Sequence, residues 1–194
     1  MTDRPRVGLA LCGSFCTFAK VMAAAERLCA QYDVTPIMSG NAAWTDSRFG
    51  RAEYFRSRLE ELTGKPVIST ITEAEPIGPK GLLDILIIAP CTGNTLAKLA
   101  NGITDSSVTM AAKAHLRNGR PVLIAVSTND GLAASAPNIG TLMSRKNIFF
   151  VPFYQDDPVK KPTSLVADFD LMEASVDYAM AGLQIQPVLL GQHA

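Results

Sequence analysis

The chain has few residues of the kinds that carry acid–base or metal chemistry. Among its 194 residues there are only two histidines, His115 and His193, and four cysteines. A zinc site needs about four clustered Cys or His ligands, and these residues do not provide pairs at a suitable spacing. The sequence therefore predicts no metal site. It also offers no Ser/His/Asp arrangement that spacing alone could support.

An excess of charge and long apolar runs are also missing. The 18 Lys and Arg residues are balanced by 18 Asp and Glu residues, so the formal net charge is zero. Without a basic stripe, nucleic acid and anionic membranes are not expected as partners. No apolar run reaches the roughly 20 residues that cross a bilayer, and the polar residues 2–6 do not introduce a signal peptide. We therefore expect a cytoplasmic protein.

The four cysteines do not suggest a disulfide framework in a chain of this size and expected location. Three of them (Cys12, Cys16 and Cys29) lie in the first thirty residues, and Cys91 follows an apolar run. We interpret them as thiols that pack as small apolar groups. A reactive thiol is the alternative for Cys91, because it lies where a strand is expected to end.

Apolar residues make up 47% of the chain, enough for one domain over residues 1–194 with a C-terminal helix and a short tail. Strands are expected at 7–11, 34–38, 67–69, 85–89, 122–126 and 148–151. Helices are expected at 15–31, 51–63, 95–102, 106–118, 139–143 and 169–183. Because nearly all-apolar strands alternate with helices, we predict an α/β fold. It is a doubly wound, Rossmann-like (flavodoxin-like) parallel sheet with helices on both faces.

Small polar residues follow four of these strands. The apolar run at 85–89 stops at Pro90 and continues into Cys91, Thr92, Gly93 and Asn94. In open α/β sheets, ligands bind beyond the carboxyl ends of the strands. The residues predicted on this basis to bind a cofactor are Gly13, Ser14, Phe15, Ser39, Pro90, Cys91, Thr92, Asn94, Thr95, Ser127, Thr128 and Asn129.

These loops favour some ligands over others. Gly13-Ser14 at a helix N-terminus suits a phosphate, although an ordinary turn and helix cap would look the same. Gly8-x4-Gly13 has the spacing of a P-loop, but Ser14-Phe15 replaces the required Lys-Ser/Thr. A Gly-x-Gly-x-x-Gly dinucleotide fingerprint is absent. The amide of Asn94 could meet both donors and acceptors of a ring such as isoalloxazine, or it could simply cap a helix.

Two further features remain. His115 lies within an expected helix and is interpreted as a surface or packing residue rather than a base. The segment 155–162 (Gln-Asp-Asp-Pro-Val-Lys-Lys-Pro) follows the last expected strand. It is either a solvated, proline-stiffened loop or a lid or docking element, in which Lys160 and Lys161 would contact a dicarboxylate substrate or a partner.

Together these loops resemble the flavoprotein superfamily of flavin-dependent cysteine decarboxylases and flavin prenyltransferases. Gly13-Ser14 matches its phosphate loop, and the segment from Pro90 to Thr95 is similar to its Pro-Ala-Ser-Ala-Asn-Thr cofactor motif. The resemblance implies a bound FMN and a homo-oligomer. The decarboxylases also carry a histidine base, a Pro-Ala-Met-Asn substrate motif and a later active-site cysteine. This chain lacks a histidine at 73–84, has Ser-Thr-Asn-Asp at 127–130, and has no cysteine after Cys91.

A narrower resemblance is to the family of dipicolinate synthase B subunits. It is carried by residues 113–121, 127–130 and 153–166, and its most specific part is 155–166. It implies an oxidoreductase component of sporulating bacteria that acts on CH–CH groups. Such a protein would work with the dipicolinate synthase A subunit, a nicotinamide-dependent partner that holds NADP, to oxidise dihydrodipicolinate to dipicolinate. The alternatives are a non-catalytic component that shapes or activates the A subunit and, less favoured, a flavin-dependent decarboxylase.

Overall fold

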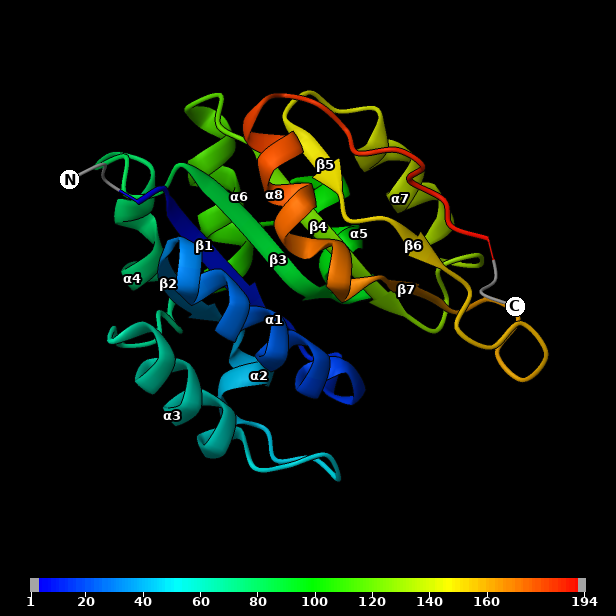
Figure 1. Ribbon diagram of the computed structural model, residues 1–194, viewed down its shortest axis with the longest axis horizontal. Coiled ribbons are helices and arrows are strands. Elements are labelled where there is room, and N and C mark those ends of the chain that lie inside the picture. The colour runs from blue at the N-terminus through cyan, green and yellow to red at the C-terminus, as the bar shows by residue number, and fades with distance from the viewer. Residues whose placement is uncertain (1–3, 192–194) are drawn as a thin grey trace.

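The computed structural model describes residues 4–191, and His193 lies outside them. In chain order the elements are β1 (Arg6–Leu11), η1 (Phe15–Thr17), α1 (Phe18–Gln31), β2 (Asp33–Met38), α2 (Gly40–Trp44), α3 (Ala52–Thr63), α4 (Ile71–Ala74), η2 (Glu75–Ile77), β3 (Ile85–Cys91), α5 (Gly93–Asn101), α6 (Ser107–Arg117), β4 (Val122–Thr128), α7 (Ala136–Met143), β5 (Ile148–Phe150), β6 (Phe153–Tyr154), β7 (Leu165–Ala167), η3 (Phe169–Leu171) and α8 (Met172–Met180). Figure 1 shows them as one sheet with helices on both sides.

The sheet has the strand order β2-β1-β3-β4-β7-β6, with β5 beside the first half of β4. Strands β1 to β5 pair in parallel, whereas β7 is antiparallel to the end of β4 and to β6. The predicted α/β fold with a mostly parallel, doubly wound sheet is confirmed. After β1 the chain moves outward to β2 and then returns to form β3 on the other side. The switch point of the topology therefore lies between β1 and β3.

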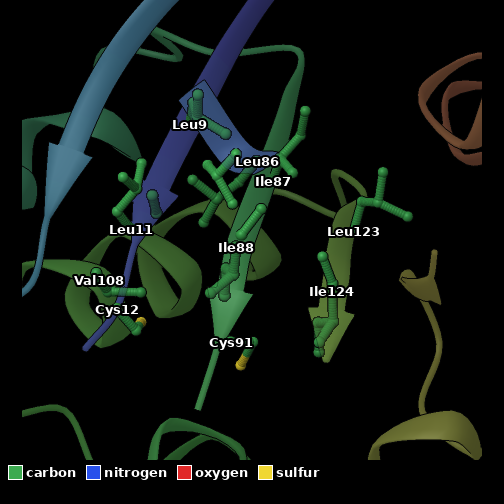
Figure 2. Close-up of a cluster of buried hydrophobic side chains, with 14 of the residues drawn as sticks. Leu9, Leu11, Cys12, Leu86, Ile87, Ile88, Cys91, Val108, Leu123 and Ile124 are labelled. Atoms are coloured by element: carbon green, nitrogen blue, oxygen red, sulfur yellow. The ribbon is translucent and has the colours of Figure 1, made fainter. Parts of the chain in front are cut away.

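Helices cover both faces because the central strands are apolar on both sides. All seven residues of β3 are buried, as are most of those in β1 and β4. Helices α1 and α8 lie on one face and contact each other, while α5 and α6 lie on the other (Figure 1). Figure 2 shows the buried side chains of Leu9, Ile87, Ile88 and Ile124 on the central strands. The apolar strands thus set the edge at which their polar loops meet.

The structure differs from the sequence-based expectation in a few elements. The short strand expected at 67–69 is reduced to a single bridge between Ile37 and Ile68. The helix expected at 169–183 begins as the 3-10 turn η3, and its α-helical part ends at Met180. Strands β6 and β7 are additions to the expected set, because two or three residues are too few to show a periodic pattern.

His115 is a packing residue of α6, as expected. Its side chain is buried, and its Nε2 atom has no hydrogen-bond partner among the described residues. Burial and the nearby charge of Arg120 lower the pKa of His115 to about 4, against an opposing hydrogen bond to the backbone of Pro121 and the charge of Asp84. The imidazole is therefore neutral at pH 7 and faces the amino ends of the strands, away from the polar loops.

Candidate functional site

A pocket of about 340 Å³ lies at the carboxyl edge of the sheet. It is formed by the loops after β1, β2 and β3, the start of α5 and the two residues just before α6, so it lies at the switch point between β1 and β3. Its lining residues are Gly13, Ser39, Gly40, Asn41, Thr92, Asn94, Thr95, Lys98, Asp105 and Ser106. This is the position at which doubly wound sheets bind nucleotide-like ligands.

Three helices begin at this pocket, each with a capping hydroxyl. Ser39 accepts a hydrogen bond from the third residue of α2, Thr92 caps α5, and Ser106 caps α6 in a capping box with Thr109. The first N–H groups of a helix have no partner within that helix, and the helix dipole adds partial positive charge there. Three such ends around one pocket favour an anionic or electron-rich ligand. Thr92, and not Asn94, is the cap of α5.

One cation lines the pocket. The Nζ atom of Lys98 lies 2.8 Å from a carboxylate oxygen of Asp105. Lys98 is the more covered of the two side chains, so the pair holds the ammonium group beside the helix ends. Asn94 is exposed, and its amide makes no hydrogen bond to another described residue. That amide is therefore free to meet a ligand.

Hydrogen bonds between elements hold the pocket walls together. The backbone N–H of Cys12 donates to the carbonyl of Pro90 over 3.2 Å, and the hydroxyl of Thr95 donates to the thiol of Cys12 over 3.3 Å. The hydroxyl of Ser107 donates to the carbonyl of Met38 over 2.6 Å. The loops after β1, β2 and β3 are therefore tied to one another and to the helices that follow.

Gly93 stands where the related cofactor motif has alanine. A Cβ atom at this position would lie 2.5 Å from the Ser135 hydroxyl and 2.8 Å from both the Asp130 carboxylate and the Thr128 hydroxyl. Those three groups form a cluster, because Thr128 and Ser135 both donate to the same oxygen of Asp130. The glycine is required by the close approach of this cluster to the start of α5.

A second group of predicted residues lies beside the pocket without lining it. The hydroxyl of Ser14 is 2.8 Å from that of Ser127, and the hydroxyl of Thr17 also reaches Ser127. The carbonyl of Asn129 accepts a hydrogen bond from Thr163, so it contacts the segment that follows residues 155–162. The predicted residues therefore divide into a pocket group and a group at the end of β4.

Three other predicted residues support the site from outside the pocket. Pro90 and Cys91 are buried within the end of β3, as Figure 2 shows for Cys91. Phe15 packs on Phe18 with ring centroids 5.3 Å apart and lines a different hollow.

The thiols near the pocket are not activated. Burial raises the pKa of Cys12 to about 11, although a hydrogen bond from Thr95 opposes this rise. Burial also raises the pKa of Cys91 well above its usual value. All four cysteines are free thiols. Cys12 and Cys91 are buried, which fits the interpretation that they pack as small apolar groups. Within residues 4–191, no group of three or more His, Cys, Asp or Glu side chains could hold a metal ion.

The segment 155–162 folds back on itself. The Nζ atom of Lys161 lies 3.1 Å from a carboxylate oxygen of Asp156, and the backbone N–H of Lys160 donates to the Asp157 carboxylate. The amide of Gln155 donates to the carbonyl of Pro162. Lys161 is thus paired within the segment, whereas the ammonium group of Lys160 has no ion pair among the described residues.

Sequence reasoning missed five lining residues: Gly40, Asn41, Lys98, Asp105 and Ser106. From the sequence, Asn41 is only part of a loop, and Asp105 is a helix-end residue without a visible partner. The available signal was the pattern Ser106-x-x-Thr109 at a helix start, which predicts exposed N–H groups at that point. The spacing in the sequence does not show that Lys98 and Asp105 lie near the loop after β2. The pairing of β1 with β2 brings them together in the folded sheet.

A model of the flavoprotein family matches residues 1–170. The B subunit of dipicolinate synthase from Bacillus subtilis (strain 168) is 47% identical over 186 residues, which cover 95% of this chain and 93% of that protein. The chain belongs to the flavoprotein family, in its branch of dipicolinate synthase B subunits. The crystal structure of the dipicolinate synthase B subunit from Bacillus halodurans C has a TM-score of 0.90 at 43% identity, covering 98% of each chain.

More distant flavoproteins share the fold. The FMN-dependent cysteine decarboxylase SpaF has a TM-score of 0.65 at 21% identity, covering 92% of this chain and 97% of its own. The FMN binding protein AtHal3 also reaches 0.65, at 19% identity, over 90% and 96% of the two chains. Both of these proteins carry FMN in their names. Within residues 4–191, no helix has the length and apolarity needed to cross a bilayer.

Proposed function

We propose that the pocket binds FMN, and that the chain is the flavin-binding component of a dipicolinate synthase, in which it acts with the nicotinamide-dependent A subunit. The observation that carries the proposal is the meeting of three helix N-termini and the cation of Lys98 in one pocket at the switch point. Membership of the flavoprotein family supports it.

The donor set fits FMN. The hydroxyls of Ser39 and Ser106, the amide of Asn41 and the ammonium group of Lys98 would hold the phosphate, together with the free N–H groups of the helix ends. The amide of Asn94 can pair with a donor and an acceptor of the ring at once. When bound, FMN supplies an acceptor for two electrons. Ser14, Ser127, Thr128 and Asn129 stay predictions for whatever part of the ligand extends beyond the pocket.

The reaction we propose is the oxidation of dihydrodipicolinate to dipicolinate, which removes two electrons and two protons from the ring. Either FMN in this chain or NADP on the A subunit would accept the two electrons in the assembled enzyme. The part of this chain is to bind and orient, and Lys160 and Lys161 would contact the substrate carboxylates or the A subunit. Lys160 is the stronger candidate, because Lys161 is already paired with Asp156.

A second candidate is a non-catalytic component that shapes or activates the A subunit. It is favoured by the absence of a free acid or base among the described residues of the pocket. Lys98 is paired with Asp105, and the thiol of Cys12 behind Thr95 has a raised pKa. The same observation counts against a flavin-dependent decarboxylase, as does the lack of a histidine at 73–84.

Fluorescence titration of FMN with the purified chain tests the proposal. Binding should quench the flavin, and Lys98→Ala and Asn41→Ala should each weaken it at least about tenfold, the effect of about 1.4 kcal/mol. Lys113→Ala removes an exposed cation outside the pocket and serves as the matched control. If the wild-type chain leaves added FMN unquenched, the flavin assignment is wrong.

Reconstitution with the A subunit separates the two candidates. Oxidation of dihydrodipicolinate is followed with and without FMN, and the isolated A subunit serves as the reference. Acceleration that requires FMN supports the first candidate. Acceleration by this chain in the absence of FMN supports the second.

A further inference from the structure

The segment 113–121, which forms the second half of α6 and the turn after it, has a role that the pocket does not explain. The fold accounts for several of its residues. The amide of Asn118 donates to the carbonyl of Gly78 over 2.7 Å, and Ala114 packs closely against the same glycine. His115 is buried. These residues join α6 to the loop after η2 and to the core, but two cations of the segment are left without such a role.

Those two cations are Lys113 and Arg117. Both are exposed, and neither side chain makes a hydrogen bond or an ion pair with another residue within 4–191. They are four positions apart in α6, so they lie on the same face of the helix. The helix dipole stabilises a cation in the last turn, such as Arg117, but this effect fades beyond that turn and does not explain Lys113.

A hollow of about 400 Å³ lies beside these cations, between α6 and the loop after η2. Its apolar lining includes Pro79, Met110 and Ala114, and Lys113 and Arg117 line it as well. An apolar centre with a polar, solvent-accessible rim is the usual anatomy of a protein–protein interface. We call the hollow with these five residues the α6 groove.

The charge around the α6 groove is positive. Lys80, which follows Pro79, is a further exposed cation without an ion pair in the described part of the chain. Glu75 is the one acid among the described residues that line the groove. The carboxylate of Glu73, nearby in sequence, is engaged in the capping box of α4. A surface that complements the groove therefore carries acidic groups and an apolar side chain.

A protein segment suits the α6 groove better than a small free anion. The last turn of α6 ends at the groove, and the partial negative charge at a helix C-terminus opposes an anion held close to it. Carboxylates on a larger partner can instead meet the exposed ends of Lys113 and Arg117, away from the helix end. An apolar side chain of the same partner then fills the hollow.

We propose that the α6 groove docks an acidic segment of the A subunit. Its carboxylates pair with Lys113 and Arg117, and an apolar side chain is buried against Met110 and Ala114. The segment 113–121 is similar to dipicolinate synthase B subunits in particular, so a partner of that branch fits the groove. The choice of partner rests on the proposed function, but the contact does not require FMN.

Docking at the α6 groove leaves the pocket open. Ser106, just before the other end of α6, lines the pocket. The 11 residues of α6 span about 16 Å, so the groove and the pocket lie at opposite ends of one helix.

Surface plasmon resonance with immobilised A subunit and the full chain, without FMN, tests the contact. Lys113→Glu/Arg117→Glu should raise the dissociation constant at least about tenfold, mainly by slowing association, because exposed interface charges act on the encounter. Added salt should weaken the wild-type complex more than that of the double variant. Lys20→Glu/Lys146→Glu reverses two exposed cations elsewhere and is the matched control, which should bind as wild type does.

A variant that gains affinity guards against loss of folding as an explanation. Glu75→Lys adds a cation to the α6 groove and should lower the dissociation constant at least about threefold at low salt. If the wild-type chain binds the A subunit and Lys113→Glu/Arg117→Glu binds it equally well, the docking proposal is overturned while the proposed function stands. If the wild-type chain does not bind the A subunit at all, the partnership in the proposed function is wrong as well.

Discussion

Replacing Gly93 by alanine should destabilise the protein, because a side chain at this position meets three polar atoms. The added Cβ would lie 2.5–2.8 Å from the oxygens of Ser135, Asp130 and Thr128. Ordinary contacts begin at about 3.4 Å, so these groups must move by more than half an ångström. They cannot move separately, because Thr128 and Ser135 both donate to the same oxygen of Asp130.

The expected cost follows from overpacking a well-filled region, which is typically about 1–3 kcal/mol. For a chain of this size, each kcal/mol lowers Tm by roughly 2–4 °C. Gly93→Ala should therefore lower Tm by roughly 2–12 °C. It should also weaken the FMN binding that we propose, because the start of α5 is displaced from the pocket.

Denaturant unfolding of four proteins measures the effect: wild type, Gly93→Ala, Ser135→Ala and the double variant. Ser135→Ala removes the nearest atom, so the double variant should be more stable than the sum of the single effects predicts, by at least about 0.5 kcal/mol. If Gly93→Ala unfolds within about 0.5 kcal/mol of wild type and shows no coupling to Ser135, the crowding argument is refuted.

Three further predictions concern buried groups. The pKa of His115 is lowered from 6.5 to about 4 in the folded state, so the unfolded chain takes up the proton first as pH falls. The free energy of unfolding therefore decreases as the pH falls below 6.5, by about 2 kcal/mol at pH 5. His115→Leu should abolish this decrease, which urea titrations at pH 7.5 and pH 5 measure. In the native protein, Cys12 and Cys91 should resist iodoacetamide while the exposed Cys16 reacts. Peptide mass spectrometry measures this, and modification of all three cysteines at equal rates would contradict the burial of Cys12 and Cys91. Gly78→Ala should lower Tm, because its Cβ would lie 2.7 Å from a backbone oxygen of α6. An unchanged melting curve would show that α6 shifts to accommodate the added methyl group at no cost in stability.

The layered fold could be predicted because the strands that form its centre are almost wholly apolar. The run from Ile85 to Ala89 has no polar interruption, so it had to be covered on both faces. The antiparallel hairpin of β6 and β7 could not be predicted in the same way. Its few residues have no periodicity, and β4 supplies the edge on which β7 pairs.

The candidate site was predicted in part. The loops after β1, β2 and β3 meet as expected, because parallel strands bring their carboxyl ends to one edge. Strand-end reasoning groups Ser127 and Asn129 with them. Ser127 does contact the loop after β1 through Ser14, and Asn129 contacts Thr163, but neither residue lines the pocket. Lys98 reaches the pocket because it lies in α5, beyond Thr92. Reasoning from strand ends considers only the residues that directly follow a strand, so it does not include Lys98.

The hydrogen bonds that join Cys12 to Pro90 and to Thr95, and Ser107 to Met38, bear on how a ligand would be received. Each joins parts of the pocket wall that are distant in sequence, and each has both of its partners within the protein. The wall therefore loses little conformational freedom when the pocket fills, and the entropic cost of ordering loops is met during folding. A ligand must therefore fit a rigid pocket wall, and its binding affinity depends on the contacts that it makes with that wall.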